Sequence, residues 1–240
     1  SIPLLLQATL AAFIFCLTAS AMYIINDVLD VNTDRQHSIK KERPLAAGHL
    51  PYSLAALAIV GLLISSFLIS LALPPLFRVT LGVYISATLA YSLYIKRVAL
   101  LDVILLGSLY TLRTVAGSTS TGIAYTPWML TFSLFLFLSL ATMKRYAELQ
   151  MFQKTNRTLI EGRGYQTSDL ELLSLVGMIS GYIAVLVLAL YINNPEVTIL
   201  YRSPWVLWLQ LPLLLYWISR MWILTHRGSM QDDPVLFMLK

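Results

Sequence analysis

The chain has 240 residues, of which 58% are hydrophobic and only 12% are charged. A soluble domain carries about 25% charged residues, so this chain has too few charges for a surface that faces water on all sides. The composition argues against a soluble enzyme, a nucleic-acid-binding protein and a disordered chain. The net charge of +5 fits Lys and Arg in the cytoplasmic loops of a membrane protein. Because the sequence starts at Ser1 and stops at Lys240 as a new apolar run begins, we expect an internal portion of a longer chain.

Seven apolar runs are each long enough to cross a bilayer, which takes about 20 mostly apolar residues. The runs are continuous rather than alternating, which favours helices over a membrane β-barrel. The expected spans are residues 3–25, 53–73, 77–95, 99–118, 127–143, 170–191 and 204–224, with the start of an eighth at 234–240. We therefore predict an all-α, polytopic membrane bundle that forms a single domain over residues 1–240.

Charged residues are unequally distributed between alternate loops. One side of the predicted bundle carries 13 of the 17 Lys and Arg residues, and the positive-inside rule places that side in the cytoplasm. All the acidic residues except Glu196 lie on the same side. Because acidic residues contribute little to topology, their gathering predicts chemistry on the cytoplasmic face, with solvated loops as the alternative.

The polar segment 26–34 stands at the cytoplasmic end of the first predicted helix. Asp27, Asp30 and Asp34 follow i, i+3, i+7 spacing, which places like charges on one helix face. A helix C-terminus also disfavours anions. A divalent cation removes both objections, and carboxylates completed by water and phosphate oxygens are typical Mg²⁺ ligands. We predict these three aspartates as metal ligands, with Asp27 and Asp30 catalytic and Asn26 binding substrate.

Three cations follow the aspartates. They are Lys40, Lys41 and Arg43, the last of which precedes Pro44-Leu45. A guanidinium can bind phosphate oxygens in pairs, and an ammonium acts as a point charge. Carboxylates that can bind a metal, next to cations that can bind phosphate, predict a diphosphate site. We predict all three cations as substrate-binding residues. The alternative is a basic loop whose charges only mark the cytoplasmic side of the membrane.

The pattern Asn26-Asp27-x-x-Asp30-x-x-x-Asp34, followed by Arg43-Pro44-Leu45, resembles the signature of the UbiA superfamily of intramembrane prenyltransferases. The resemblance covers essentially the whole chain. It implies a Mg²⁺-dependent helical bundle of nine helices, of which the family's first and last are missing here. It also implies a polyprenyl lipid substrate, a phosphorylated soluble donor, a surrounding lipid bilayer and no nucleic acid, and it leaves room for a homo-oligomer. The expected location is the bacterial inner membrane, with the active site facing the cytoplasm.

Two departures from the aromatic prenyltransferases resemble one branch of the superfamily. Their second Asp-rich motif is replaced here by Lys144-Arg145-Tyr146-Ala147-Glu148, and Ile39 stands where they usually have an extra arginine. Both features are similar to the decaprenyl-phosphate phosphoribosyltransferases of cell wall biosynthesis. That branch transfers phosphoribose from phosphoribosyl diphosphate to a polyprenyl phosphate and releases diphosphate.

The branch assigns Lys144 as catalytic and Arg145 and Glu148 as substrate-binding. The physical chemistry agrees, because a donor with an additional phosphate and an acceptor that is itself a phosphate demand more fixed cations. The alternative for this segment is an i,i+4 ion pair between Lys144 and Glu148 at a helix end.

Other polar residues allow two interpretations each. Tyr91 and Lys96 resemble the family's Tyr-rich segment ending in lysine and are predicted to bind substrate, although tyrosines at a helix end also form interfacial belts. Asp102 is expected to orient a cation or a sugar hydroxyl, or to pair with Arg97. We leave open the roles of three further residues, Arg113, Asp232 and Asp233.

The runner-up function is transfer of a polyprenyl group from its diphosphate to an aromatic acceptor. A seven-helix transporter or receptor is the rival from another class. A retinal protein would need a buried lysine in the last span, and residues 204–224 contain none. A transporter usually has ionisable groups near the midplane or inverted repeats, and the sequence shows acids at one interface and no repeat.

Overall fold

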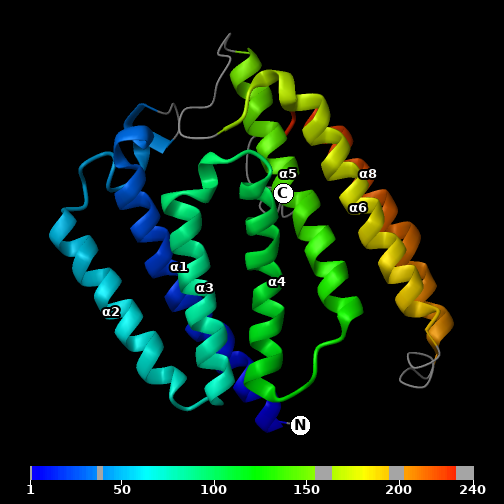
Figure 1. The fold of residues 1–240 in the computed structure, drawn as a ribbon, viewed down its shortest axis with the longest axis horizontal. Coiled ribbons are helices and arrows are strands. Elements are labelled where there is room, and N and C mark those ends of the chain that lie inside the picture. The colour runs from blue at the N-terminus through cyan, green and yellow to red at the C-terminus, as the bar shows by residue number, and fades with distance from the viewer. Residues whose placement is uncertain (1, 37–39, 155–163, 195–202, 231–240) are drawn as a thin grey trace. The chain divides into compact units, whose positions relative to one another are not determined.

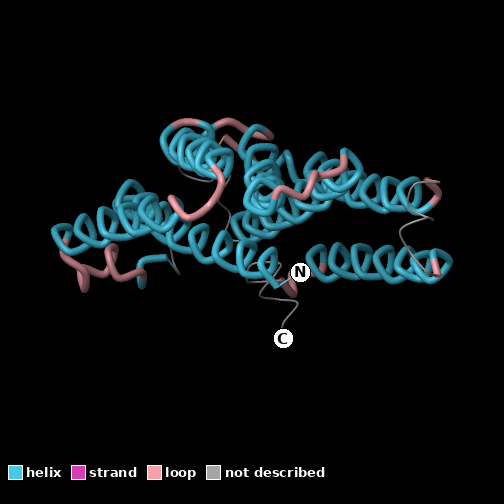
Figure 2. The backbone as a smooth tube through the Cα atoms, turned by 90° about the horizontal axis from the view of Figure 1, so that it is seen from below, coloured by secondary structure: helices cyan, strands magenta, loops and turns pink. Residues whose placement is uncertain are grey.

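A computed structural model describes residues 2–36, 40–154, 164–194 and 203–230. Regular structure in these ranges is entirely helical, which confirms the all-α prediction (Figure 2). The helices are α1 (Ile2–Gln36), α2 (Tyr52–Ser70), α3 (Pro75–Leu93), α4 (Leu101–Thr121), α5 (Pro127–Lys154), α6 (Leu170–Ile192) and α8 (Gln210–His226). Short 3-10 helices are η1 (Lys40–Glu42), η2 (Ile95–Arg97), η3 (Thr167–Asp169) and η4 (Pro204–Leu209).

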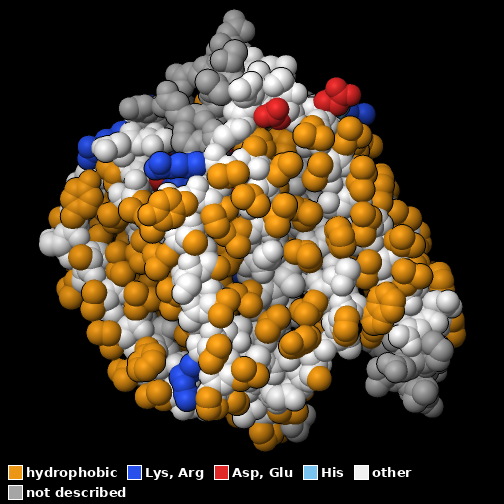
Figure 3. Space-filling model, in the orientation of Figure 1, with side chains coloured by type: hydrophobic (Ala, Val, Ile, Leu, Met, Phe, Trp, Pro, Cys, Tyr) orange, Lys and Arg blue, Asp and Glu red, His pale blue; other side chains and the backbone are white. Residues whose placement is uncertain are grey.

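Within the described ranges, six helical segments are long and apolar enough to cross a membrane. They correspond to α1, α2, α3, α5, α6 with η3, and α8 with most of η4. Helix α4 has 21 residues but is not one of the six, and it contains Asp102 and Arg113. The predicted eighth span, and with it Asp232 and Asp233, lies outside the described residues, as do Ile39 and Glu196. Figure 3 shows a face dominated by hydrophobic side chains, with the visible charged groups near helix ends. The protein is an integral membrane protein.

Two helices extend further than hydropathy predicts. The first predicted span ends at residue 25, but α1 continues to Gln36, so the Asp-rich motif is part of the helix. The fifth predicted span ends at 143, but α5 continues to Lys154. No glycine or proline interrupts either extension, so the helical hydrogen bonding continues after the apolar residues end.

The chain falls into two compact units, which divide α4 between them. The first unit holds residues 1–96 and 112–125. In it, α1 packs beside α2 and α3 (Figure 1). The hydroxyls of Thr18 on α1 and Ser66 on α2 lie 2.6 Å apart and are buried. The ring of Phe15 packs against Phe77 and Tyr84 on α3. The prediction of one domain stays a prediction.

The second unit holds residues 97–111 and 126–240, and its core lies among α5, α6 and α8. Glycines permit the close packing of α6: a Cβ at Gly177 would lie 2.1 Å from Cζ2 of Trp222. The indole N–H of Trp222 donates to Ser139 Oγ on α5 at 3.2 Å. The segment that carries Lys144, Arg145 and Glu148 is therefore part of a helix that a packed core holds in place.

Candidate active site

The first cluster of polar side chains forms where Arg43 folds back onto α1. Arg43 Nη1 donates to Asp27 Oδ1 at 2.7 Å and to Asp34 Oδ2 at 2.8 Å. Beneath this contact, Val31 of α1 and Leu45 of the following turn are buried in one small hydrophobic cluster. The turn thus anchors the guanidinium at a point where two carboxylates, spaced i, i+7 on one helix face, converge.

Asp30 has a different cation. Lys96, the middle residue of the 3-10 helix η2, forms an ion pair with Asp30, and its ammonium nitrogen lies 3.5 Å from Asn26 Oδ1. The lysine side chain is only 9% exposed. The structure therefore brings together six of the predicted residues in the first unit: Asn26, Asp27, Asp30, Asp34, Arg43 and Lys96.

These pairings correct the expected electrostatics of the motif. The sequence predicted that all three carboxylates lie at the C-terminus of a helix. In the structure, Asp27 and Asp30 lie well before the end of α1 at Gln36. Only Asp34 lies in the last turn, where the dipole disfavours an anion. Arg43 and Lys96 offset the mutual repulsion of the three carboxylates.

Two of the three aspartates form a donor set that suits Mg²⁺. No group of three His, Cys, Asp or Glu side chains is close enough to hold a metal among the described residues. Mg²⁺ is usually bound through one or two carboxylates, with water and substrate phosphates completing its shell. Asp27 and Asp34 fit that description, because their oxygens already converge on one positively charged nitrogen. A metal role for all three aspartates stays a prediction.

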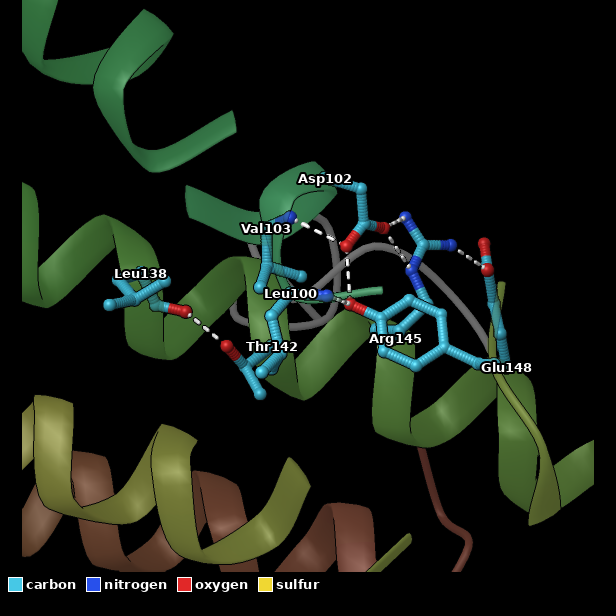
Figure 4. Close-up of polar contacts among 8 residues, drawn as sticks. Leu100, Asp102, Val103, Leu138, Thr142, Arg145 and Glu148 are labelled. Carbon is cyan, nitrogen blue, oxygen red and sulfur yellow. Dashed lines mark hydrogen bonds and ion pairs between the residues drawn. The ribbon is translucent and has the colours of Figure 1, made fainter. Parts of the chain in front are cut away.

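The second cluster lies in the second unit and is centred on the buried side chain of Arg145 (Figure 4). Its Nε and Nη2 both lie 2.9 Å from Asp102 Oδ2, and its Nη1 binds Glu148 one turn along α5. Asp102 is fully buried, and its Oδ1 also accepts hydrogen bonds from the N–H of Val103, at 2.7 Å, and from the hydroxyl of Tyr165. Of the two alternatives for Asp102, the structure shows orientation of a cation.

Tyr165 closes this cluster. Its hydroxyl accepts the N–H of Leu100 at 2.8 Å, and its ring lies 5.9 Å from the guanidinium carbon of Arg145. Burial, followed by the hydrogen bond to Asp102, raises the pKa of the Tyr165 hydroxyl, so it stays a proton donor at physiological pH.

The other predicted residues are placed as follows. Lys41 on η1 and Lys144 on α5 are exposed, whereas Lys40 on η1 and Tyr91 on α3 are half-buried. Their roles in binding substrate stay predictions.

Sequence reasoning assigned no role to Tyr165 and left Asp102 open. The available signal for Asp102 was an acid entering a predicted membrane span, which requires a partner. Tyr165 carried no comparable signal, since its partners are 63 and 65 residues away in the sequence.

Comparison with known proteins agrees with both the motif and the fold. Residues 1–240 match the UbiA prenyltransferase family. The chain belongs to that family. UbiA membership confirms the predicted resemblance.

Three relatives show how far the sequence similarity extends. Protein y4nM of Sinorhizobium fredii is 38% identical over 98% of this chain and 46% of its own length. Nodulation protein NoeC of Azorhizobium caulinodans is 32% identical over 97% of this chain and 76% of its own. The decaprenyl-phosphate phosphoribosyltransferase of Mycolicibacterium smegmatis is 36% identical over 68% of this chain and 51% of its own. The chain thus spans about half the length of protein y4nM and of the Mycolicibacterium smegmatis enzyme.

Solved structures show the same fold. A UbiA homologue from Archaeoglobus fulgidus bound to GPP and Mg²⁺ superposes with a TM-score of 0.70 at 16% identity, covering 92% of this chain and 86% of the other. The homologue bound to DMAPP and Mg²⁺ gives 0.72 at 17% identity, with 92% and 76% covered.

Proposed function

We propose that this UbiA-family protein transfers a phosphoribosyl group from phosphoribosyl diphosphate to a polyprenyl phosphate, of which decaprenyl phosphate is the expected form. The observation that carries the proposal is the α5 segment. Glu148 is fixed by Arg145, and exposed Lys144 stands one turn before it on the same helix. A carboxylate accepts hydrogen bonds from sugar hydroxyls and an ammonium binds phosphate. A prenyl diphosphate has no hydroxyl for Glu148 to bind.

The reaction forms a bond between an oxygen of the lipid phosphate and the anomeric carbon of ribose, and breaks the bond from that carbon to diphosphate. The lipid phosphate is already anionic at neutral pH, so no strong general base is needed. Arg43, Lys40 and Lys41 stabilise the charge that grows on the departing diphosphate. Asn26, Tyr91 and Lys96 complete the proposed set of substrate-binding residues.

Asp27, Asp30 and Asp34 would hold Mg²⁺, which when bound supplies positive charge to the leaving diphosphate. Both solved homologues contain Mg²⁺, which supports this assignment. In the second unit, Lys144 binds the 5-phosphate of the donor or the lipid phosphate. Glu148 binds a ribose hydroxyl, and Arg145 holds Glu148 rather than a phosphate, because its guanidinium already binds two carboxylates. We place these groups at the cytoplasmic face of the bacterial inner membrane.

The test is incorporation of ³²P from labelled phosphoribosyl diphosphate into lipid by membranes that contain the protein. We expect label in a polyprenyl phosphoribose product that depends on added decaprenyl phosphate. Absence of labelled lipid, in membranes where the protein is folded and abundant, would reject the proposal.

A second candidate is prenyl transfer to an aromatic acceptor, because the solved homologues hold GPP or DMAPP. The same membranes supplied with a labelled prenyl diphosphate and an aromatic acid separate the two reactions. Label in a prenylated aromatic product, with none from phosphoribosyl diphosphate, would establish this candidate instead.

A further inference from the structure

The buried ion pair of Arg145 and Asp102 is held in a single orientation. The Asp102 carboxylate accepts from four donors: two nitrogens of Arg145, the backbone N–H of Val103 and the hydroxyl of Tyr165. Side-chain exposure is 2% for Arg145 and zero for Asp102. A buried charge pair is stabilised only when geometry and additional hydrogen bonds satisfy both partners. These four donors meet that condition and engage both oxygens of the carboxylate.

Glu148 is the member of this network that is least buried. Arg145 presents one edge of its guanidinium to Asp102 and the opposite nitrogen to Glu148, whose side chain is 23% exposed. Glu148 is thus the most exposed of the four polar side chains, and the rigid fork of Arg145 sets where its carboxylate lies. Any group that fixes Arg145 also fixes the half-buried carboxylate of Glu148.

Backbone features bring Tyr165 to this place. A Cβ at Gly164 would lie 2.5 Å from the carbonyl oxygen of Arg97, so only glycine permits this close approach. Leu100 is the one non-glycine residue with positive φ, at 66°, among the described residues, and its N–H donates to the Tyr165 hydroxyl. A left-handed conformation at a leucine is uncommon and persists only when its surroundings impose it.

We propose that Tyr165 and Asp102 are positioning residues that act through Arg145 to aim Glu148 at a hydroxyl of the sugar in the donor. In this relay the Tyr165 hydroxyl holds the carboxylate of Asp102, Asp102 holds Arg145, and Arg145 holds Glu148. Tyr165 is therefore the residue of the relay that is furthest from the proposed substrate. The inference rests on the proposed phosphoribosyl transfer and assigns recognition of the ribose hydroxyls to the second unit.

Tyr165→Phe is the informative variant, because it removes the hydroxyl and keeps the ring beside Arg145. Asp102 is unsuitable for this test, since its loss would take a fully buried carboxylate away from the buried guanidinium of Arg145 and would itself disturb the fold. Glu148→Gln tests the end of the relay that is proposed to contact the donor. Tyr182→Phe is the control, because its hydroxyl also joins two helices of the second unit, lying 3.2 Å from Ser219 Oγ.

The experiment compares kcat/KM for phosphoribosyl diphosphate with kcat/KM for donors that lack the 2- or the 3-hydroxyl. With the natural donor, Tyr165→Phe and Glu148→Gln should each lose about tenfold or more, and Tyr182→Phe less than about twofold. With the donor that lacks the recognised hydroxyl, wild type and both relay variants should agree within about twofold, because the contact that they perturb is already absent.

A loss in Tyr165→Phe that is equal for all three donors would show a structural role only and would overturn the inference, as would no loss at all. Either result, with an active wild type, leaves phosphoribosyl transfer standing. A folded wild type that is inactive with phosphoribosyl diphosphate would instead remove the proposed function and this inference together.

Discussion

At the scale of single residues, two of this chain's own cations pair with the three carboxylates of the aspartate motif and partly offset their charge. Arg43 joins Asp27 and Asp34, and Lys96 holds Asp30. The sequence predicts a cluster of carboxylates next to cations, because the spacing and the residue types are visible in it. It does not predict which cation binds which carboxylate, since that depends on how the turn after α1 folds back.

Asp27→Asn should lower turnover about 10²-fold or more, because it removes one of the charges proposed to hold the metal. The fold should survive, since Arg43 keeps its contact with Asp34. Initial rates over a Mg²⁺ titration, with EDTA as the zero point, measure the effect. Glu171→Gln is the matched control, because it removes an exposed acid from the first turn of α6. Full activity of Asp27→Asn, or of wild type in EDTA, would contradict the metal assignment.

Lys144→Ala should lose donor affinity or turnover by at least tenfold, because the exposed ammonium is proposed to bind a phosphate. Lys144→Arg keeps the charge and should recover most of the activity. Arg220→Ala removes one exposed cation from α8 and controls for the change in net charge. If Lys144→Ala matched Arg220→Ala in steady-state kinetics with phosphoribosyl diphosphate, Lys144 would have no role in binding the donor.

At the scale of elements, hydropathy locates the helices but not the ends of the two helices that carry site residues. Apolar runs mark the membrane thickness, and α2, α3 and α6 agree with prediction within a few residues. Helices α1 and α5 continue beyond the apolar runs, and both carry their site residues on the polar extension. Composition alone does not separate a polar helix from a polar loop, so the predicted apolar spans end at residues 25 and 143, although the i, i+3, i+7 spacing of the aspartates already indicated a helix.

Gly177→Ala should destabilise the second unit by about 1–3 kcal/mol or more, since the new methyl group would overlap the indole of Trp222. Gly82→Ala on α3 is the matched control, because nothing lies within 4 Å of its added Cβ. That control should be neutral or slightly stabilising, as alanine favours a helix over glycine. Thermal unfolding in detergent measures both. Equal melting temperatures for the two variants would contradict the described packing of α6 against α8.

At the scale of the whole molecule, the membrane class and the family follow from composition and one motif. The contacts between distant segments do not: Asp102 and Arg145 are 43 residues apart, and neither local pattern names the other as its partner. The structure supplies that pairing and the division of the chain into two units.

Topology can be tested within the first unit. In a Cys16→Ser background, a cysteine at His49 should react only with membrane-permeant reagents in intact cells, whereas one at Tyr125 should react with impermeant reagents. Both positions are exposed, and they lie in the turns after η1 and α4. The expectation follows from the excess of Lys and Arg in the loop after the first helix. The reverse labelling pattern would place the aspartate motif outside the cytoplasm.

The single nitrogen of Arg43 that contacts both Asp27 and Asp34 has a consequence for the order of ligand binding. Arg43 cannot use that nitrogen for the two carboxylates and for diphosphate at once. An ion that takes the carboxylates releases Arg43 for the diphosphate, and a diphosphate that draws Arg43 away leaves the carboxylates in need of an ion. Linkage then requires that each ligand raise the affinity for the other by the same factor. The half-saturating concentration of Mg²⁺ should therefore fall as the donor concentration rises.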